Sequence, residues 1–401
     1  MEVGEDAEEE RQQITVVGAG IGGLALAGAL AATGTPYTVY EQADRFAEVG
    51  AGVQLSPNAL RPLARLGLGP ALDEWGVRIE AMEVRGWTGR PIARTPLGEE
   101  CERLFGAPYR TIHRAHLHEA LLSLGDRERV RLKSRLDSVE QTPDGARLFF
   151  ADGTVRTAGV LVGADGIHST VREVLRKDDP VFSGLGIYRG LVPVEKLPAE
   201  AREALVRLWL GPGGHFVCYP VDGGRQISFA ATVPMPHAPH ESWSAPADPA
   251  DLVRAFGGWT GLVSDIARNV EELHQWALHD RSPLRRWSTS HITLLGDAAH
   301  PMLPFMAQGA NQAIEDAMDL AACLTREPRT TVAERLARYE ALRVPRTAEI
   351  QRASRGNADF LHLPDGPAQR RRDARMAVGA SLRDRATLYA HETGRSVLAG
   401  A

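Results

Sequence analysis

The first strongly apolar part of the chain lies between residues 14 and 40. Residues 14–17 form a short apolar run whose length suits a strand buried on both faces. A glycine-rich turn follows, then a segment rich in Ala and Leu that stops at Gly34, and then a second strand-like run at residues 37–40. The pattern predicts a strand, a helix and a strand, joined as a βαβ unit.

Two later apolar runs each lead into an aspartate. Asp165 follows residues 160–162, and Asp297 follows residues 292–295. Ligands meet open α/β sheets at the carboxyl ends of strands, so both aspartates are candidate ligand contacts. Asp165 fits a turn or a helix cap equally well, because a helix is expected to begin near Ser169.

Two long helices are predicted near the end of the chain. The first opens at Gly309 and carries apolar residues at helical spacing, so its first backbone amides would stabilise negative charge. The second occupies residues 331–365 and should be kinked at Pro345. The arginine run at residues 370–372 is interpreted as a solvated face or tail.

The remaining stretches alternate short strand-like runs with turn residues. Residues 77–109 predict a small antiparallel excursion, and turns at residues 144–145 and 152–153 predict two hairpins. Residues 181–287 are richer in aromatics and proline and predict a separate, largely antiparallel sheet over the substrate.

The glycine turn of the βαβ unit carries the spacing GxGxxG. Gly18, Gly20 and Gly23 would serve a tight turn, close approach of a pyrophosphate to the backbone, and tight packing of helix on strand, respectively. Glu41 ends the second strand about 20 residues further on, where a carboxylate can accept hydrogen bonds from an adenosine ribose. The unit therefore predicts dinucleotide binding, but NAD and FAD share the adenosine half and both remain open.

Composition narrows the class of partner. The 401 residues include 43% hydrophobic and 24% charged residues with a net charge of −5, which is typical of a globular protein with no footprint for nucleic acid. The acidic start lacks the features of a signal peptide, and no apolar run approaches a membrane span. Three widely spaced cysteines suggest neither a disulfide framework nor a metal site. We expect a cytoplasmic protein that binds small molecules.

Several other residues are candidates for chemistry. Arg114 falls in the first turn of a predicted helix, which is unfavourable for a cation unless an anionic or carbonyl-bearing ligand lies there; an exposed arginine without a role fits equally well. His113, His116 and His118 do not share one helical face, so no metal site is predicted.

The strand predicted around residues 215–221 brings two polar side chains to one face. His215 and Tyr219 alternate with Val217 between them, so an imidazole and a phenol lie along the same strand. A hydrogen-bonded structural histidine is the alternative interpretation of His215.

Three motifs now stand in one order: GAGIGG with its downstream glutamate, GADGIHSTVR, and LLGDAAHPMLPFMAQGANQAIEDA. Together with the late SRGNADFLHLPDGP, they resemble the single-component flavoprotein aromatic hydroxylases, the group A monooxygenases that include p-hydroxybenzoate hydroxylase. The chain is most similar to the branch of salicylate hydroxylase, 3-hydroxybenzoate 6-hydroxylase and 6-hydroxynicotinate 3-monooxygenase. The resemblance spans nearly the whole chain and favours FAD over NAD as the resident dinucleotide.

The resemblance implies a fold and a set of domains. The fold class is α/β + β, in which a Rossmann-type FAD-binding domain carries an inserted antiparallel-sheet substrate domain and a C-terminal helical segment. The expected boundaries are a disordered acidic tail at 1–11, an FAD-binding domain at 12–76, 111–180 and 288–330, a substrate domain at 77–110 and 181–287, a C-terminal helix at 331–365 and a tail at 366–401.

The resemblance also assigns residues to roles. The residues implied to hold FAD are Gly18, Gly20, Gly23 and Glu41 for the ADP half, and Gln54, Arg114, Asp165, Asp297, Pro301, Gly309, Ala310 and Asn311 for the pyrophosphate, ribityl and flavin parts. The implied catalytic residues are His215 as a base, Tyr219 as a residue that orients the substrate, and Gln308 as a residue facing the ring. No arginine is evident that would clamp a substrate carboxylate.

The implied function is hydroxylation of a small phenolic or heteroaromatic, carboxylated substrate, with or without decarboxylation. FAD would be tightly bound, NADH or NADPH would bind transiently, and O2 would react through a flavin C4a-hydroperoxide. Epoxidation or hydroxylation of an indole or polyketide is the alternative within the fold, and a flavin- or nucleotide-binding protein without turnover is the alternative of another class. A monomer or homodimer is expected, without nucleic acid or membrane.

Overall fold

The βαβ unit predicted at the start of the chain is confirmed. The computed structural model describes residues 13–46, 51–237, 245–326, 330–379 and 381–394, so the predicted acidic tail lies outside the described residues. β1 (Ile14–Val17), α2 (Ile21–Ala32) and β2 (Tyr37–Tyr40) follow one another, and β1 pairs with β2 in parallel.

The βαβ unit belongs to a parallel five-stranded sheet with the order β19-β12-β1-β2-β8. Its other strands are β8 (Val130–Arg131), β12 (Val160–Gly163) and β19 (Ile292–Leu294). All five strands run the same way, so the loops that follow β1, β12 and β19 emerge at one edge. Those loops contain the glycine motif and both predicted aspartates.

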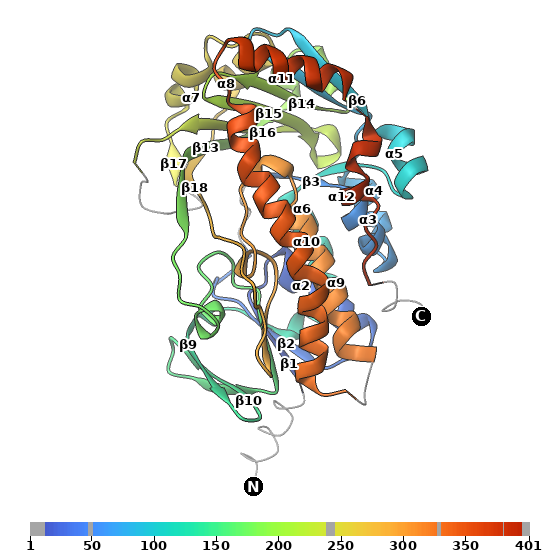
Figure 1. Cartoon of the computed structure of the whole chain (residues 1–401), viewed down its shortest axis with the longest axis vertical. Helices are drawn as coiled ribbons and strands as arrows, with labels where there is room; N and C mark the ends of the chain where they lie inside the picture. The colour runs from blue at the N-terminus through green and yellow to red at the C-terminus, as the bar shows by residue number, and fades with distance from the viewer. Residues whose placement is uncertain (1–12, 47–50, 238–244, 327–329, 380, 395–401) are drawn as a thin grey trace.

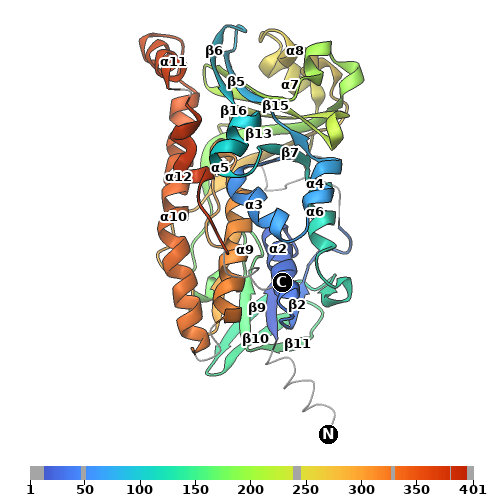
Figure 2. The same cartoon turned by 90° about the vertical axis from the view of Figure 1, so that its right-hand side faces the viewer.

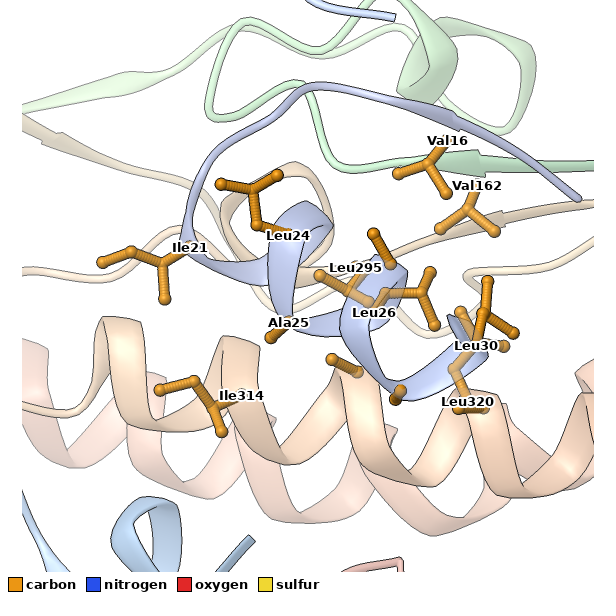
Figure 3. Packing of buried hydrophobic residues seen from close by; sticks show 14 of the residues in the cluster. Val16, Ile21, Leu24, Ala25, Leu26, Leu30, Val162, Leu295, Ile314 and Leu320 are labelled. Carbon is orange, nitrogen blue, oxygen red and sulfur yellow. The ribbon is translucent and has the colours of Figure 1, made fainter. Parts of the chain in front are cut away.

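α2 is apolar all round because it is covered on both sides. Figure 3 shows it between Val16 and Val162 of the sheet and Ile314 and Leu320 of α9 (Gly309–Arg326). Its residues are small or aliphatic, and a Cβ at Gly22 would collide with the Leu295 side chain. Glycine there allows α9 to pack closely against α2. This layer is the main hydrophobic core.

A second, eight-stranded sheet forms the upper part of the molecule (Figure 1). It is antiparallel throughout except where β5 and β14 pair in parallel. The predicted antiparallel sheet is therefore confirmed, and the stretch at 77–109 joins the same sheet. The strand order is β17 (Pro246–Ala247), β18 (Leu273–Asp280), β13 (Val181–Pro193), β16 (Gln226–Pro234), β15 (Gly214–Val221), β14 (Leu205–Gly211), β5 (Ala81–Gly86) and β6 (Pro91–Pro96).

Smaller elements complete the two layers. The predicted hairpins are confirmed as a three-stranded antiparallel sheet. The strands of this sheet are β9 (Leu136–Thr142), β10 (Gly145–Phe150) and β11 (Val155–Ala158). A second small sheet lies between the two large ones and contains β3 (Gly52–Leu55), β7 (Arg110–His113) and β4 (Val77–Arg78). The remaining helices of these layers are α3 (Pro57–Arg65), α4 (Gly69–Trp75), α5 (Gly98–Phe105), α6 (Arg114–Leu122), α7 (Pro249–Phe256) and α8 (Leu262–Asn269).

The C-terminal part departs from its prediction. α10 (Val332–Leu361) runs along the long axis of the molecule and ends beside the eight-stranded sheet, where α11 (Pro367–Val378) packs across it (Figures 1 and 2). The interpretation of Arg372 as solvated is wrong: its side chain is buried, and it donates to the Leu361 carbonyl at 2.8 Å. A further short helix, α12 (Ala386–Tyr389), follows within the stretch predicted to be a tail.

Two other observations complete the fold. The helix expected near Ser169 is only a single 3-10 turn, Val171–Val174. Among the described residues, no helix has both the length and the apolar character that crossing a membrane requires.

Candidate active site

A cavity of about 370 Å³ lies where the carboxyl ends of the parallel strands meet one face of the eight-stranded sheet. The β1–α2 turn, the loops after β12 and β19, and the N-terminus of α9 line one side. Residues of β13, β15, β16 and β18 line the other. This is the position at which open α/β sheets bind ligands.

The three motif glycines have three different structural reasons. Gly18 has a φ of +103°, and a Cβ there would collide with the Ala164 carbonyl oxygen. A Cβ at Gly23 would collide with the Gly18 carbonyl oxygen. Gly20 has an ordinary φ of −73°, and a Cβ there would meet no protein atom within 4 Å. Neither backbone conformation nor internal packing demands glycine at position 20, so the room at the cavity wall is left for a ligand, as a bound pyrophosphate would require.

Glu41 is fixed in place at the end of β2. Its carboxylate accepts from the backbone N–H of Ala19 at 2.8 Å and from that of Ala43 at 2.9 Å. The side chain thus ties the end of the second strand to the glycine turn. A carboxylate has lone pairs beyond these two bonds, so the placement is compatible with accepting hydroxyls of a ribose.

Arg114 and Asp297 bring opposite charges to the cavity. Both side chains line it and are exposed to its interior. Desolvation raises the pKa of Asp297, while His300 and Arg114 act in the opposite direction. Desolvation also lowers the pKa of Arg114, against the attraction of Asp297. A cation and an anion so enclosed provide donors and an acceptor for a polar ligand between them.

The start of α9 borders the cavity through Gly309 and Ala310, as predicted. Gln308 also lines it, but its side-chain amide is engaged within the protein: Nε2 donates to Ser56 Oγ at 3.1 Å, and Oε1 accepts from Gln312 Nε2 at 3.0 Å. Gln308 therefore holds the turn that presents the helix amides.

Asp165 is held in the loop after β12. Its carboxylate accepts from Ser169 Oγ at 2.5 Å and from the N–H of Val171 at 3.2 Å, so the capping interpretation describes its contacts. Its neighbours Ala164 and Gly166 line the cavity, whereas Asp165 is not among the described residues that do.

Pro301 and Asn311 are likewise absent from the described cavity wall. Asn311 Nδ2 donates to the carbonyl oxygens of Gln54 at 2.9 Å and Ala307 at 2.7 Å, which joins α9 to β3. The Gln54 side chain does line the cavity, and its Oε1 accepts from the Tyr109 hydroxyl at 2.8 Å.

β15 presents His215, Val217 and Tyr219 to the cavity, as the alternation predicted. The Tyr219 hydroxyl donates to the Gly52 carbonyl at 3.0 Å, and burial raises the pKa of this phenol. Desolvation, together with a second histidine, lowers the pKa of His215 to about 3. The imidazole is therefore neutral at neutral pH, and its burial makes it a weaker base than an exposed histidine.

That second histidine is His362, which the sequence analysis did not single out. His215 Nδ1 lies 2.7 Å from His362 Nε2, and the two rings stack with centroids 5.0 Å apart. His362 caps the end of α10, 147 positions further along the chain. Its motif contributed to the family resemblance, but nothing in the spacing connects it to β15.

Arg189 is a second residue that the sequence analysis missed. It lies on β13, lines the cavity, and its guanidinium stacks over Trp276 at 4.8 Å from the ring centroid. Desolvation lowers its pKa, and its Nε has no hydrogen-bond partner among the described residues. The structure thus places in the cavity wall an arginine that was not evident from the sequence. An arginine within an otherwise apolar strand was the available clue.

The histidines of the α6 region are engaged separately. His113 Nδ1 accepts from the N–H of Ala115 at 3.3 Å, and His118 Nε2 contacts the Ala19 carbonyl at 2.8 Å. Within the described ranges, no group of three or more His, Cys, Asp or Glu side chains could hold a metal ion.

The chain is similar to known proteins over most of its length. Residues 11–354 match the family described as FAD binding domain. The chain is 47% identical to PtmB3, a 3-amino-4-hydroxybenzoate 2-monooxygenase of Streptomyces platensis, over 95% of this chain and 96% of that protein. It is 37% identical to 3-hydroxybenzoate 6-hydroxylase 1 of Aquipseudomonas alcaligenes, over 90% of this chain and 93% of that protein.

A solved structure is similar over the same extent. HpxO of Klebsiella pneumoniae, crystallised with FAD and uric acid, superposes with a TM-score of 0.81 at 27% identity, covering 91% of this chain and 92% of that one. The likeness thus extends over nine-tenths of the fold.

Proposed function

The chain belongs to the FAD binding domain family, within which we propose that it hydroxylates 3-amino-4-hydroxybenzoate, or an aminohydroxybenzoate of similar size, at ring carbon 2. The predicted family is confirmed: the protein is an FAD-dependent aromatic monooxygenase acting on a small aromatic substrate. The identity of that substrate is our proposal.

One observation carries the proposal: a cation and a neutral base face the same cavity from one sheet. Arg189 and Val217 each pair with Ala230 across adjacent strands, and His215 lies two residues from Val217. Arg189 and His215 are thus two strand spacings apart across the sheet and two residues apart along it, which separates their Cα atoms by about 12 Å. A ring with a carboxylate at one end and a hydroxyl and an amine at the other suits this separation.

Arg189 provides the anchor. A desolvated guanidinium whose Nε has no hydrogen-bond partner among the described residues favours an anionic ligand, and its fork geometry matches a carboxylate. Trp276 beneath the guanidinium holds its plane. The carboxylate of a benzoate would remove the penalty of leaving this charge without a partner.

Bound FAD would supply the oxygen transfer, with NADH or NADPH as the source of electrons and O2 as the oxidant. We propose that Gly20 leaves room for its pyrophosphate, that Asp297 accepts from its ribityl hydroxyls, and that Arg114 and the amides at the start of α9 face its flavin side. The enclosing sheet would keep water from the reacting ring.

His215 has a specific task in this reaction. Attack at ring carbon 2 places positive charge on the neighbouring amino nitrogen, and a base that takes an N–H proton relieves that charge. The ring regains aromaticity when the proton on carbon 2 passes to a water molecule and the protonated imidazole returns its proton to the nitrogen. A neutral imidazole can perform both transfers, as base and then as acid.

The substrate is tested with FAD-loaded protein and a panel of 3-amino-4-hydroxybenzoate, 4-hydroxybenzoate, 3-hydroxybenzoate and 2-aminophenol. We expect the first to give the largest stimulation of NADH or NADPH oxidation and a product that gains one oxygen and keeps its carboxylate. A product that has lost carbon dioxide, or stronger stimulation by another member of the panel, would contradict the assignment.

Substitution of Arg189 tests the anchor. Arg189→Met should raise the KM for the carboxylated substrate by about 10- to 100-fold, because a charge-assisted hydrogen bond is lost. The KM for 2-aminophenol, which lacks the carboxylate, should change little. Arg202→Met removes an exposed arginine of the same region and serves as the matched control. An equal loss for both ligands in Arg189→Met would show that Arg189 supports the fold rather than the carboxylate.

A further inference from the structure

The contact between His215 and His362 joins the cavity to the outer helical layer. His215 is buried in the sheet, whereas His362 is half-buried where α10 ends (Figure 2). The next residues, Leu363 and Asp365, line an open surface groove between α11 and the sheet edge. His215 thus lies at the cavity and the half-buried His362 lies nearer the surface, and each imidazole can donate or accept a proton.

Packing holds the two rings in register. Phe305 lies edge-on to both, with centroids 5.3 Å from His215 and 5.6 Å from His362. The His362 carbonyl accepts from the Gly213 N–H at 3.1 Å, which fixes the end of α10 to the start of β15. The 2.7 Å contact between the two rings is therefore held by α10, by β15 and by the Phe305 ring.

The hydrogen bond makes the state of one ring depend on the other. Only one nitrogen of each neutral imidazole carries a proton, and His215 can offer a free Nε2 to the substrate only if its Nδ1–H donates to His362 Nε2. The partner therefore sets which tautomer faces the cavity. A lone buried histidine would have no such control.

We propose that His362 is a positioning residue and the second member of a proton relay that connects His215 to solvent. The inference rests on the proposed function of the cavity. When His215 Nε2 accepts a proton from the substrate, its Nδ1 proton passes to His362 Nε2, and His362 releases its own Nδ1 proton outward. One proton enters and one leaves, so both imidazoles are neutral again but with reversed tautomers, and reprotonation of the substrate resets them.

The charged and titratable groups that face the pair are few. Desolvation lowers the pKa of His362 to about 4, with Asp359 of α10 acting against this and Arg372 of α11 adding to it. His362 is the group that acts electrostatically on His215. Neither ring thus holds a permanent charge at neutral pH, which suits transfer rather than storage of a proton.

The test uses the FAD-loaded enzyme and two substitutions, His362→Ala and His362→Gln. Both should bind the substrate with unchanged Kd, because His362 does not line the cavity, yet slow the hydroxylation step in single turnover by at least about 10-fold. The loss should depend on pH and buffer concentration, and added imidazole should restore rate to His362→Ala. His291 lies just before β19, at the end of that strand remote from the cavity. His291→Gln is therefore the control and should keep the parent rate.

The outcomes are distinguishable. If His362→Gln, which preserves a hydrogen bond but cannot relay a proton, keeps the parent rate and pH profile, the relay is overturned and His362 only packs. Failure of imidazole to restore His362→Ala would also overturn it. If the parent enzyme itself turns over none of the panel substrates, the proposed function fails before the relay is reached.

Discussion

At the scale of the residue, the glycine motif separates two positions that the fold requires from one that we propose serves a ligand. Gly18 and Gly23 are required by backbone conformation and by close contact with carbonyl oxygens. Gly20 is required by neither. A sequence motif therefore contains both folding and binding information, and substitution can divide the two.

Two matched substitutions make that division measurable. Gly20→Ala should change the unfolding free energy of the FAD-free protein by no more than about 1 kcal/mol, since alanine is only a poorer N-cap, but should weaken FAD binding. Gly23→Ala should instead lower the yield or thermal midpoint of the FAD-free protein. Thermal unfolding with and without FAD compares the two; equal FAD affinity in Gly20→Ala and the parent would refute the ligand role of that position.

Residues differ in how far sequence alone could reveal them. His215 and Tyr219 were accessible because alternation along one strand places them on one face. Arg189 and His362 were not, because their importance depends on contacts with elements distant in sequence. For Asp165 the sequence left a ligand contact and a capping role open, and its bonds to Ser169 and Val171 are those of a cap.

At the scale of the element, α10 is fastened to α9 by buried charge. Arg343 Nη1 donates to Glu315 at 2.6 Å and its Nε to Asp316 at 2.7 Å, with the three side chains fully buried. Asp316 also accepts from the Gly296 N–H at 3.0 Å and from His300 at 2.5 Å. The network thus connects the outer helix to the loop that carries Asp297.

Removal of the central cation should be costly. Arg343→Met removes the cation that the two buried carboxylates share, leaving Glu315 with Arg346 and Asp316 with His300, and should lower the unfolding free energy by about 3 kcal/mol. The loop at Gly296 should loosen as well, so FAD affinity should fall. Arg352→Met, on the exposed side of the same helix, should stay within about 0.5 kcal/mol of the parent. Chemical denaturation of both variants measures the difference, and equal stabilities would show that the network is not needed to hold α10.

At the scale of the whole molecule, buried histidines make stability depend on acid. The pKa is lowered to about 3 in His215 and to about 4 in His362 and His391. Each unfolded histidine titrates near 6.5, so below that pH the unfolded chain binds more protons and the folded state loses stability. Asp319, whose pKa is raised to about 6, acts in the opposite direction, as do Asp165 and Asp297, whose pKa values are also raised, whereas the lowered pKa of His118 adds to the effect of the three histidines.

The thermal midpoint of the protein should therefore fall as the pH decreases from 7 to 5. His362→Gln removes one of the three histidines and should make this decline shallower, by up to about 1.4 kcal/mol for each pH unit below 6.5. Thermal scans across the pH range, at matched ionic strength, measure the slope. A slope that does not change on substitution would show that His362 titrates normally in the folded protein.

Much of the molecule as a whole followed from its sequence, because local patterns specify it. The parallel unit, the hairpins and the antiparallel sheet each have a short-range signature of apolar periodicity and turn residues. The C-terminal helix α11 was missed, since its buried residues are the charged Arg372 and Asp373, of which Arg372 bonds to the end of α10. Burial of a charged residue against a distant backbone has no counterpart in hydropathy.

The parallel pairing of β5 with β14 has a consequence for recombination between relatives. The eight-stranded sheet takes one edge from residues 81–96 and its other strands from residues 181–280. Strands of the parallel sheet lie between these two stretches and after them in the sequence. A chimaera that exchanged only the longer stretch would set a foreign strand against a native one along the whole of β5. Substrate preference should therefore transfer between family members only when both stretches come from the same parent.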